Sequence, residues 1–204
     1  MMAMVIWAWA AGCAGACLGG RWLVARGVRR THRPGSAIVW GLVAVPAVPA
    51  LPALTWELIP ALGWMALLTA ISRVDHAVRL IPDRFLAAAA GCAIAATWPV
   101  FPTTPQMTAV AVSGVLLLVL RTAGRRRFRR EALGLGDVKL GMVLALQLTP
   151  LVLCLVWCGA ALAGLVAEAV RRRRNGCRDP RGVPLGTWLC IATLCAAPFP
   201  EVRL

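Results

Sequence analysis

The sequence predicts an all-α, polytopic membrane protein: a helical bundle of about eight transmembrane helices in a single domain covering residues 1–204. Two observations support this fold class. First, 60% of the residues are hydrophobic and only 15% are charged, with a mean hydropathy of +0.75, whereas soluble domains are about one quarter charged. Second, the basic residues are gathered in connections between long apolar segments, as in proteins that cross a membrane several times.

Eight apolar segments approach the length needed to cross a bilayer, which is about 20 residues. The first, 2–20, is followed rather than preceded by basic residues, so we expect a membrane span and not a cleaved signal peptide. The second, 36–54, contains three prolines and is expected to be irregular, because each proline removes a backbone donor. The sixth is short and requires a turn at Thr149-Pro150 before the seventh. The predicted spans are 2–20, 36–54, 57–72, 85–101, 106–120, 138–150, 151–170 and 184–200.

The distribution of positive charge predicts the orientation of these spans. All but one of the 22 Lys and Arg residues lie in the first, third, fifth and seventh connections or at their edges, and the exception is Arg203. Lys and Arg accumulate in cytoplasmic loops. The odd-numbered connections are therefore predicted to be cytoplasmic, and both termini are predicted to lie outside.

Composition also disfavours several classes of function. The net charge of +14 does not indicate nucleic-acid binding, because the arginines lie between apolar segments and aromatic residues do not alternate with them as a series of stacking platforms would. Contact with membrane lipid headgroups is the ordinary property of such loops. The cysteines form no CxxC pair, so a structural zinc site is not expected. No cofactor is predicted. His32 and His76 form no metal-ligand motif, and no serine lies in a nucleophile elbow, which disfavours metallopeptidases and serine peptidases.

Two aspartates at segment edges are the best candidates for chemistry. Asp75 and Asp137 are separated by two predicted spans, one leading out and one leading back, so both are expected at the cytoplasmic boundary. An acid at this depth is costly, and a functional role is the default hypothesis. Two carboxyl groups brought close together tend to share one proton. Such a pair can activate water and polarise a carbonyl group, which suits peptide hydrolysis without a metal.

Gly134 and Gly136 precede the second acid. Without a Cβ, each is expected to let a substrate strand approach closely or to adopt a positive φ. The alternative is an ordinary flexible loop in which Asp137 caps the start of a helix. The GxGD pattern alone does not decide between a catalytic and a capping role for Asp137.

The wider sequence resembles the prepilin peptidases, which are membrane aspartic peptidases of the GxGD type. The resemblance rests on the run from Glu131 to Leu140 together with the run from Asp75 to Asp83. It implies that Asp75 and Asp137 are the catalytic pair, that the partner is a type IV pilin-like precursor whose leader peptide is cleaved, and that the protein lies in the inner membrane of a prokaryote. Lys139 would lie where it could bias the charge of Asp137, and Asp83 is expected to cap the fourth span.

The sequence also departs from that family. Long members carry two CxxC pairs in a cytoplasmic region and methylate their product, but the first loop here, 21–35, has no cysteine; a short, peptidase-only form is therefore expected. Residues 183–187, Val-Pro-Leu-Gly-Thr, match a family element only in part, and their role stays open. The competing interpretation is a non-enzymatic small transporter or assembly scaffold whose acids bind protons or cations.

Overall fold

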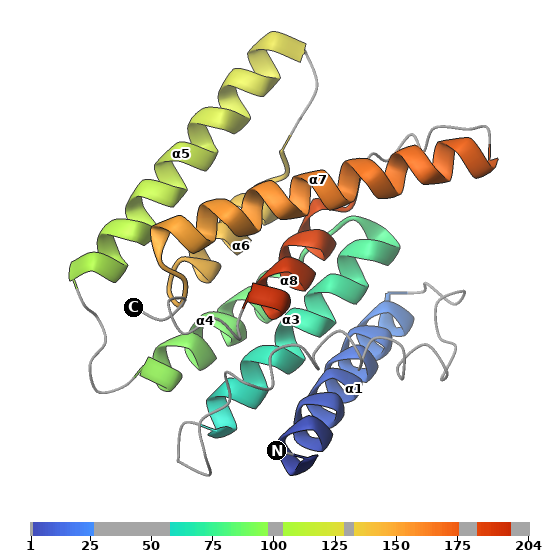
Figure 1. Cartoon of the computed structure of the whole chain (residues 1–204), viewed down its shortest axis with the longest axis vertical. Helices are drawn as coiled ribbons and strands as arrows, with labels where there is room; N and C mark the ends of the chain where they lie inside the picture. Colours follow the sequence, from blue (N-terminus) through green and yellow to red (C-terminus); the bar gives the residue numbers. More distant parts are fainter. Residues whose placement is uncertain (1, 27–57, 98–103, 129–132, 176–182, 197–204) are drawn as a thin grey trace.

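The computed structural model describes residues 2–26, 58–97, 104–128, 133–175 and 183–196 (Figure 1). Every regular element within these ranges is an α-helix, so the predicted all-α class is confirmed for the described part of the chain. The predicted span 36–54 lies outside the described residues. The helices are α1 (Met2–Ala25), α3 (Leu58–Val78), α4 (Asp83–Thr97), α5 (Thr104–Phe128), α6 (Leu135–Leu144), α7 (Pro150–Asn175) and α8 (Leu185–Ala196).

Two of these helices are long and apolar enough to cross a bilayer: α5 over Gln106–Arg127 and α7 over Pro150–Arg174. Both end in arginines, which favourably oppose the negative C-terminal end of a helix dipole. Together with the composition they indicate a membrane protein. The number of eight spans and the outside position of the termini stay predictions.

The centre of the bundle is α3, which contacts α1, α4 and α8. Its fully buried residues include Leu68, Ile71 and Val74, three or four positions apart, so one face of the helix is lined with branched apolar side chains. Leu140 of α6 and Leu189 of α8 belong to the same buried cluster. The core therefore joins the three helices whose ends form the candidate site.

Helices α1 and α3 pack at close range through small residues. A Cβ added at Gly15 would lie 1.9 Å from the carbonyl oxygen of Ala66, and one added at Gly19 would lie 2.9 Å from that of Ala70. This is a G-x-x-x-G pattern facing alanines, the arrangement that lets helices approach in membranes. The guanidinium of Arg73, which is buried, then donates to the carbonyl of Ala16 across the same interface.

Helix α6 is only ten residues long, about 15 Å at 1.5 Å per residue, half of the hydrocarbon thickness. It ends at Leu144, earlier than the predicted span 138–150. The predicted turn is confirmed, because α7 begins at Pro150. Leu117 of α5 and Trp157 of α7 contact α6 at Gly141, where an added Cβ would lie 2.5 Å and 2.8 Å from their side chains.

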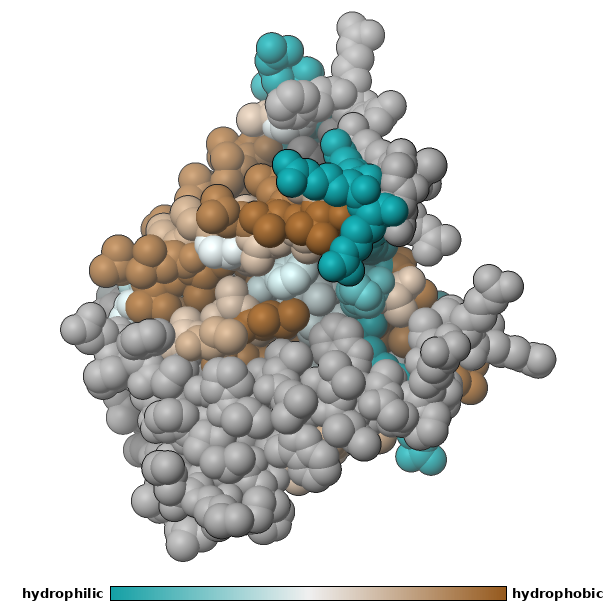
Figure 2. Space-filling view, turned by 45° about the vertical axis from the view of Figure 1, so that its right-hand side comes forward, coloured by the Kyte–Doolittle hydropathy of each residue, from teal (hydrophilic) through white to brown (hydrophobic). Residues whose placement is uncertain are grey.

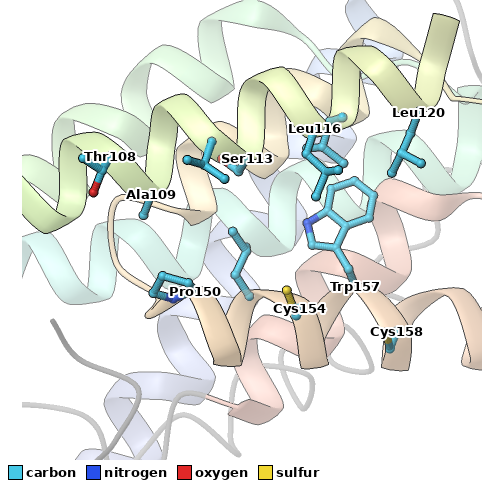
Figure 3. Close-up of a pocket in the computed structure, with 12 residues that line it drawn as sticks. Thr108, Ala109, Ser113, Leu116, Leu120, Pro150, Cys154, Trp157 and Cys158 are labelled. Atoms are coloured by element: carbon cyan, nitrogen blue, oxygen red, sulfur yellow. The ribbon is translucent and has the colours of Figure 1, made fainter. Parts of the chain in front are cut away.

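Many exposed side chains of α5 and α7 are large and apolar, and in the coloured part of Figure 2 apolar residues predominate beside a band of hydrophilic ones. An apolar groove of about 320 Å³ lies between the two helices. In Figure 3, Trp157 reaches from α7 toward Leu116 of α5, while Cys154 and Cys158 follow one wall. Apolar walls at this depth are compatible with contact with lipid chains.

Candidate active site

Asp75 lies in the last turn of α3 and is 5% exposed. Its oxygen Oδ2 accepts two hydrogen bonds from Thr187 of α8. The backbone N–H of Thr187 donates at 2.7 Å and its hydroxyl oxygen lies at 3.0 Å. Two donors on one oxygen favour the ionised carboxylate and fix its orientation.

The chain turns sharply directly after this acid. Arg79 has a φ of 58°, the only positive φ among the non-glycine residues described, and its N–H donates to the carbonyl oxygen of Asp75 at 2.9 Å. A residue in the left-handed conformation commonly ends a helix, but glycine is the usual choice. An arginine at this position costs on the order of 1 kcal/mol, and it places a positive charge whose field acts on Asp75. The turn thus brings a positive charge near Asp75, which favours the ionised form of that carboxyl group.

Asp137 lies in the first turn of α6, where the positive end of the helix dipole favours an anion. The N–H of Gly134 donates to its Oδ2 at 3.2 Å. Asp137 therefore also has the capping contact that the alternative interpretation expected. The Asp137 side chain is partly buried, whereas Gly134 is exposed.

The start of α8 brings the two acids together. Thr187 donates to Asp75, and the backbone N–H of the preceding residue, Gly186, acts on Asp137. A Cβ added at Gly186 would lie 3.1 Å from Oδ2 of Asp75 and 2.7 Å from Cδ1 of Ile81. A side chain at position 186 would therefore crowd Ile81 and the Asp75 carboxylate, so glycine keeps space for the acids beside the start of α8.

The two predicted glycines also lie at this site, one beside the Asp137 carboxylate and one against Ile81. Neither Gly134 nor Gly136 has a positive φ. An added Cβ at Gly136 would lie 3.1 Å from Cβ of Ile81, and one at Gly134 would lie 3.1 Å from Oδ2 of Asp137. The first glycine thus keeps space beside the carboxylate, and the second lets α6 pack against the loop after α3.

The two acids influence each other's protonation. Both lie outside the predicted spans 57–72 and 138–150. Burial raises the pKa of Asp137, and the negative charge of Asp75 raises it further, to about 6, against the opposing effect of the N–H groups of Gly134 and Gly186. Burial also raises the pKa of Asp75, but the two Thr187 hydrogen bonds and the charges of Arg79 and His76 act against it. The pKa of each acid is therefore raised on balance, and Asp75 differs from Asp137 in having a side-chain donor, the Thr187 hydroxyl, beside a backbone N–H.

Lys139 differs from its expected placement. Its ammonium pairs with Oδ1 of Asp83 at 2.7 Å, so it is directed to the first turn of α4 and not to Asp137. The reason is helical geometry: residues two apart on a helix point in different directions. The predicted position of Asp83 at the start of the fourth helix is confirmed, since α4 begins there.

Sequence reasoning left Gly186 and Thr187 without a role. Thr187 is 112 positions from Asp75, so no local pattern links them. The available signal was a Pro-x-Gly-Thr run directly before an apolar segment, at the same predicted membrane face as both acids.

Comparison with known proteins agrees with this geometry. The sequence pattern of the type IV leader peptidase family matches residues 62–168, a range that contains both aspartates and ends before α8. Neither the curated proteins nor the solved structures gave a match. Aspartic-type peptidase activity at a membrane is the general property that the family match implies. Because the match covers more than half of the sequence, the chain belongs to the type IV leader peptidase family.

Proposed function

We propose that the protein is a multi-pass aspartic endopeptidase of a prokaryotic inner membrane. Its substrate is a type IV pilin-like precursor, and it removes the leader peptide at the cytoplasmic boundary. The family match supports leader-peptide cleavage. The alternating distribution of the basic residues supports the cytoplasmic position of the site.

One observation carries the proposal: the N–H groups of consecutive residues of α8 act on the two acids, that of Thr187 on Asp75 and that of Gly186 on Asp137. Because the start of α8 contacts both carboxyl groups, it joins them into a single unit. If each acid only capped its own helix, the two would need no common partner. Carboxyl groups that interact share a proton over a broad pH range. The unit therefore has one base and one acid available at once, which hydrolysis of an amide requires.

The proposed reaction uses both protonation states. The ionised carboxylate takes a proton from water as the water oxygen attacks the scissile carbonyl carbon, and the protonated carboxyl gives its proton to the carbonyl oxygen. When the tetrahedral intermediate collapses, the C–N bond breaks. The new amine takes the proton held by the first acid, and the second acid recovers a proton from a hydroxyl of the intermediate. Each acid ends in its starting state.

The open side of this unit is at the start of α6. Gly134 is exposed and lies directly beside the Asp137 carboxylate. An extended leader segment that passed this point would bring its carbonyl groups close to the acid without meeting a side chain at position 134. We infer that Gly134 is the place where the substrate backbone approaches, while Gly136 serves packing.

The test is co-expression with a candidate pilin precursor in a host that lacks other such peptidases, with leader loss followed as a gel shift. Asp75→Asn and Asp137→Asn keep the shape of the side chain but remove the ionisable carboxyl, and each should abolish cleavage. Asp83→Asn is the matched control, because this exposed acid pairs with Lys139 outside the unit and its loss should leave processing in place. Normal processing by the Asp137→Asn protein would refute the mechanism and favour the transporter or scaffold interpretation.

A further inference from the structure

Thr187 lies beyond the part of the chain matched by the family pattern, yet it makes the closest polar contacts of the candidate site. It is 2% exposed, and its partner Asp75 is 5% exposed. Four polar contacts join Thr187 to α3. Two run from its N–H and its hydroxyl to Oδ2 of Asp75. The Thr187 hydroxyl also lies 3.1 Å from the Ser72 carbonyl oxygen, and the Ser72 hydroxyl donates to the Thr187 carbonyl oxygen at 3.4 Å.

The hydroxyl of Thr187 has one hydrogen and two neighbouring oxygens. The Ser72 carbonyl can only accept, and it lies within α3, where carbonyls also accept from the helix backbone. When Asp75 is ionised, the hydrogen is drawn to the carboxylate, because a charged acceptor forms the stronger bond. When Asp75 is protonated, the hydrogen can turn to Ser72, and the hydroxyl oxygen then accepts from the acid. The hydroxyl orientation therefore follows the charge of Asp75.

The backbone N–H of Thr187 has no such freedom. It is fixed by α8 and points at Oδ2 from 2.7 Å, so it always favours negative charge on that oxygen. Both donors act on Oδ2, which leaves Oδ1 as the oxygen that Thr187 does not occupy. Among the described residues, the hydrogen-bond donors to Asp137 are instead the backbone N–H groups of Gly134 and Gly186.

We propose that Thr187 is a positioning residue that holds Asp75 as the ionised member of the pair, leaves Oδ1 of Asp75 for the reacting water, and thereby assigns the shared proton to Asp137. This inference rests on the proposed peptidase function. The other charged or titratable groups that act on Asp75 are Arg79 and His76 of its own segment and Asp137 of α6. On α8, the Cys190 thiol interacts electrostatically with both acids.

The experiment is a pH profile of kcat and kcat/KM for the purified full-length protein in liposomes. The substrate is a synthetic precursor with a basic leader, a glycine at the cleavage site and an apolar helix. Thr187→Val keeps the shape and the N–H group but removes the hydroxyl. Loss of a donor to the anion raises the pKa of the base, so the acidic limb should move up by about one pH unit. Activity below that limb should fall about tenfold, with near-normal activity at higher pH.

Two further variants separate this role from packing. Thr187→Ser retains the hydroxyl and should restore the wild-type profile. Thr193→Val is the matched control, because Thr193 is also a buried threonine of α8, but its hydroxyl donates to the carbonyl of Leu189 in its own helix. Its profile should keep both limbs in place. Thr187→Ala, which leaves more room, must show the same upward movement as Thr187→Val.

The direction of the change decides the assignment. If Asp75 carried the proton instead, loss of the hydroxyl would remove an acceptor for the acid, and the basic limb would move down. That result, or a uniform loss of activity with both limbs in place, would overturn the proposal. Cleavage by the wild-type protein together with its loss in Asp137→Asn would show in either case that the proposed function stands on its own.

Discussion

The backbone N–H of Thr187 and Oδ2 of Asp75 lie 2.7 Å apart, although 112 positions of sequence separate them. This contact joins the end of α3 to the start of α8. Because Gly186 acts on Asp137 from the neighbouring position, small movements of α8 must change the environments of both acids together. The first prediction concerns that coupling.

Gly186→Ala should lower peptidase activity at least tenfold. The added Cβ meets Cδ1 of Ile81 at 2.7 Å and Oδ2 of Asp75 at 3.1 Å, so the Ile81 side chain, the Asp75 carboxylate or α8 itself must move. Ile81→Val removes Cδ1 and should partly rescue Gly186→Ala, while costing about 1 kcal/mol by itself. Gly91→Ala in α4 is the control, since an added Cβ there meets nothing within 4 Å. Initial rates of leader cleavage measure the effect, and equal rates for Gly186→Ala and Gly91→Ala would contradict it.

Asp137→Asn should stabilise the protein at neutral and alkaline pH. The folded pKa of Asp137 is raised to about 6, so the native state binds this proton more tightly than the unfolded chain. The unfolding free energy is therefore unaffected below about pH 4, falls as the pH rises toward 6, and stays lower above it, by at most about 3 kcal/mol. Thermal unfolding in detergent should show a higher Tm for Asp137→Asn at pH 8 and no difference at pH 3.5. A lower Tm at pH 8 would show that the acid is not destabilising.

Lys139→Met should have little effect. The ion pair with Asp83 is short, at 2.7 Å, but the two side chains are 51% and 73% exposed, and such pairs contribute about 0–1 kcal/mol. Cleavage rates should remain within about twofold of wild type across the pH range. A shift in either limb of the pH profile would mean that Lys139 acts on Asp137 after all.

Gly15→Val should disrupt the packing of α1 on α3. A Cβ at this position would lie 1.9 Å from the carbonyl oxygen of Ala66, which is backbone and cannot rotate away, so the helices must separate. Gly159→Val in α7 is the matched control, because a Cβ added at this position meets no atom within 4 Å. Protease sensitivity in membranes should rise for Gly15→Val alone. Equal sensitivity of the two variants would show that α1 does not need close contact.

The orientation of the spans is tested with reporter fusions. Cytoplasmic signals are expected after Arg33, Arg84, Arg130 and Arg181, and exterior signals near Pro102 and Pro150. The physical reason is the concentration of Lys and Arg in alternate connections. An exterior signal after Arg130 would place the glycine run on the other face from the expected leader peptide.

The sequence was sufficient to predict the helical class and the turn before Pro150, because these depend on composition and hydrophobic runs, while the catalytic role of Asp75 and Asp137 stays a prediction. It did not predict the direction of Lys139, although its position two residues from Asp137 on a helix already argues against a common direction. The contribution of α8 could not be predicted at all. The contacts of Thr187 with Asp75 depend on how helices far apart in the chain pack against each other, and the hydrophobic periodicity of the sequence does not indicate this packing.

The place of α8 in the chain has a consequence for biosynthesis. Ribosomes make α3 and α6 first, so Asp75 and Asp137 enter the nascent protein well before Gly186 and Thr187 exist. Until α8 arrives, Asp75 lacks both of its Thr187 donors, and burying a carboxyl group without its hydrogen-bond donors is unfavourable. A chain stopped before residue 184 should therefore be catalytically silent, so that leader cleavage begins only after α8 has been made and has packed against α3.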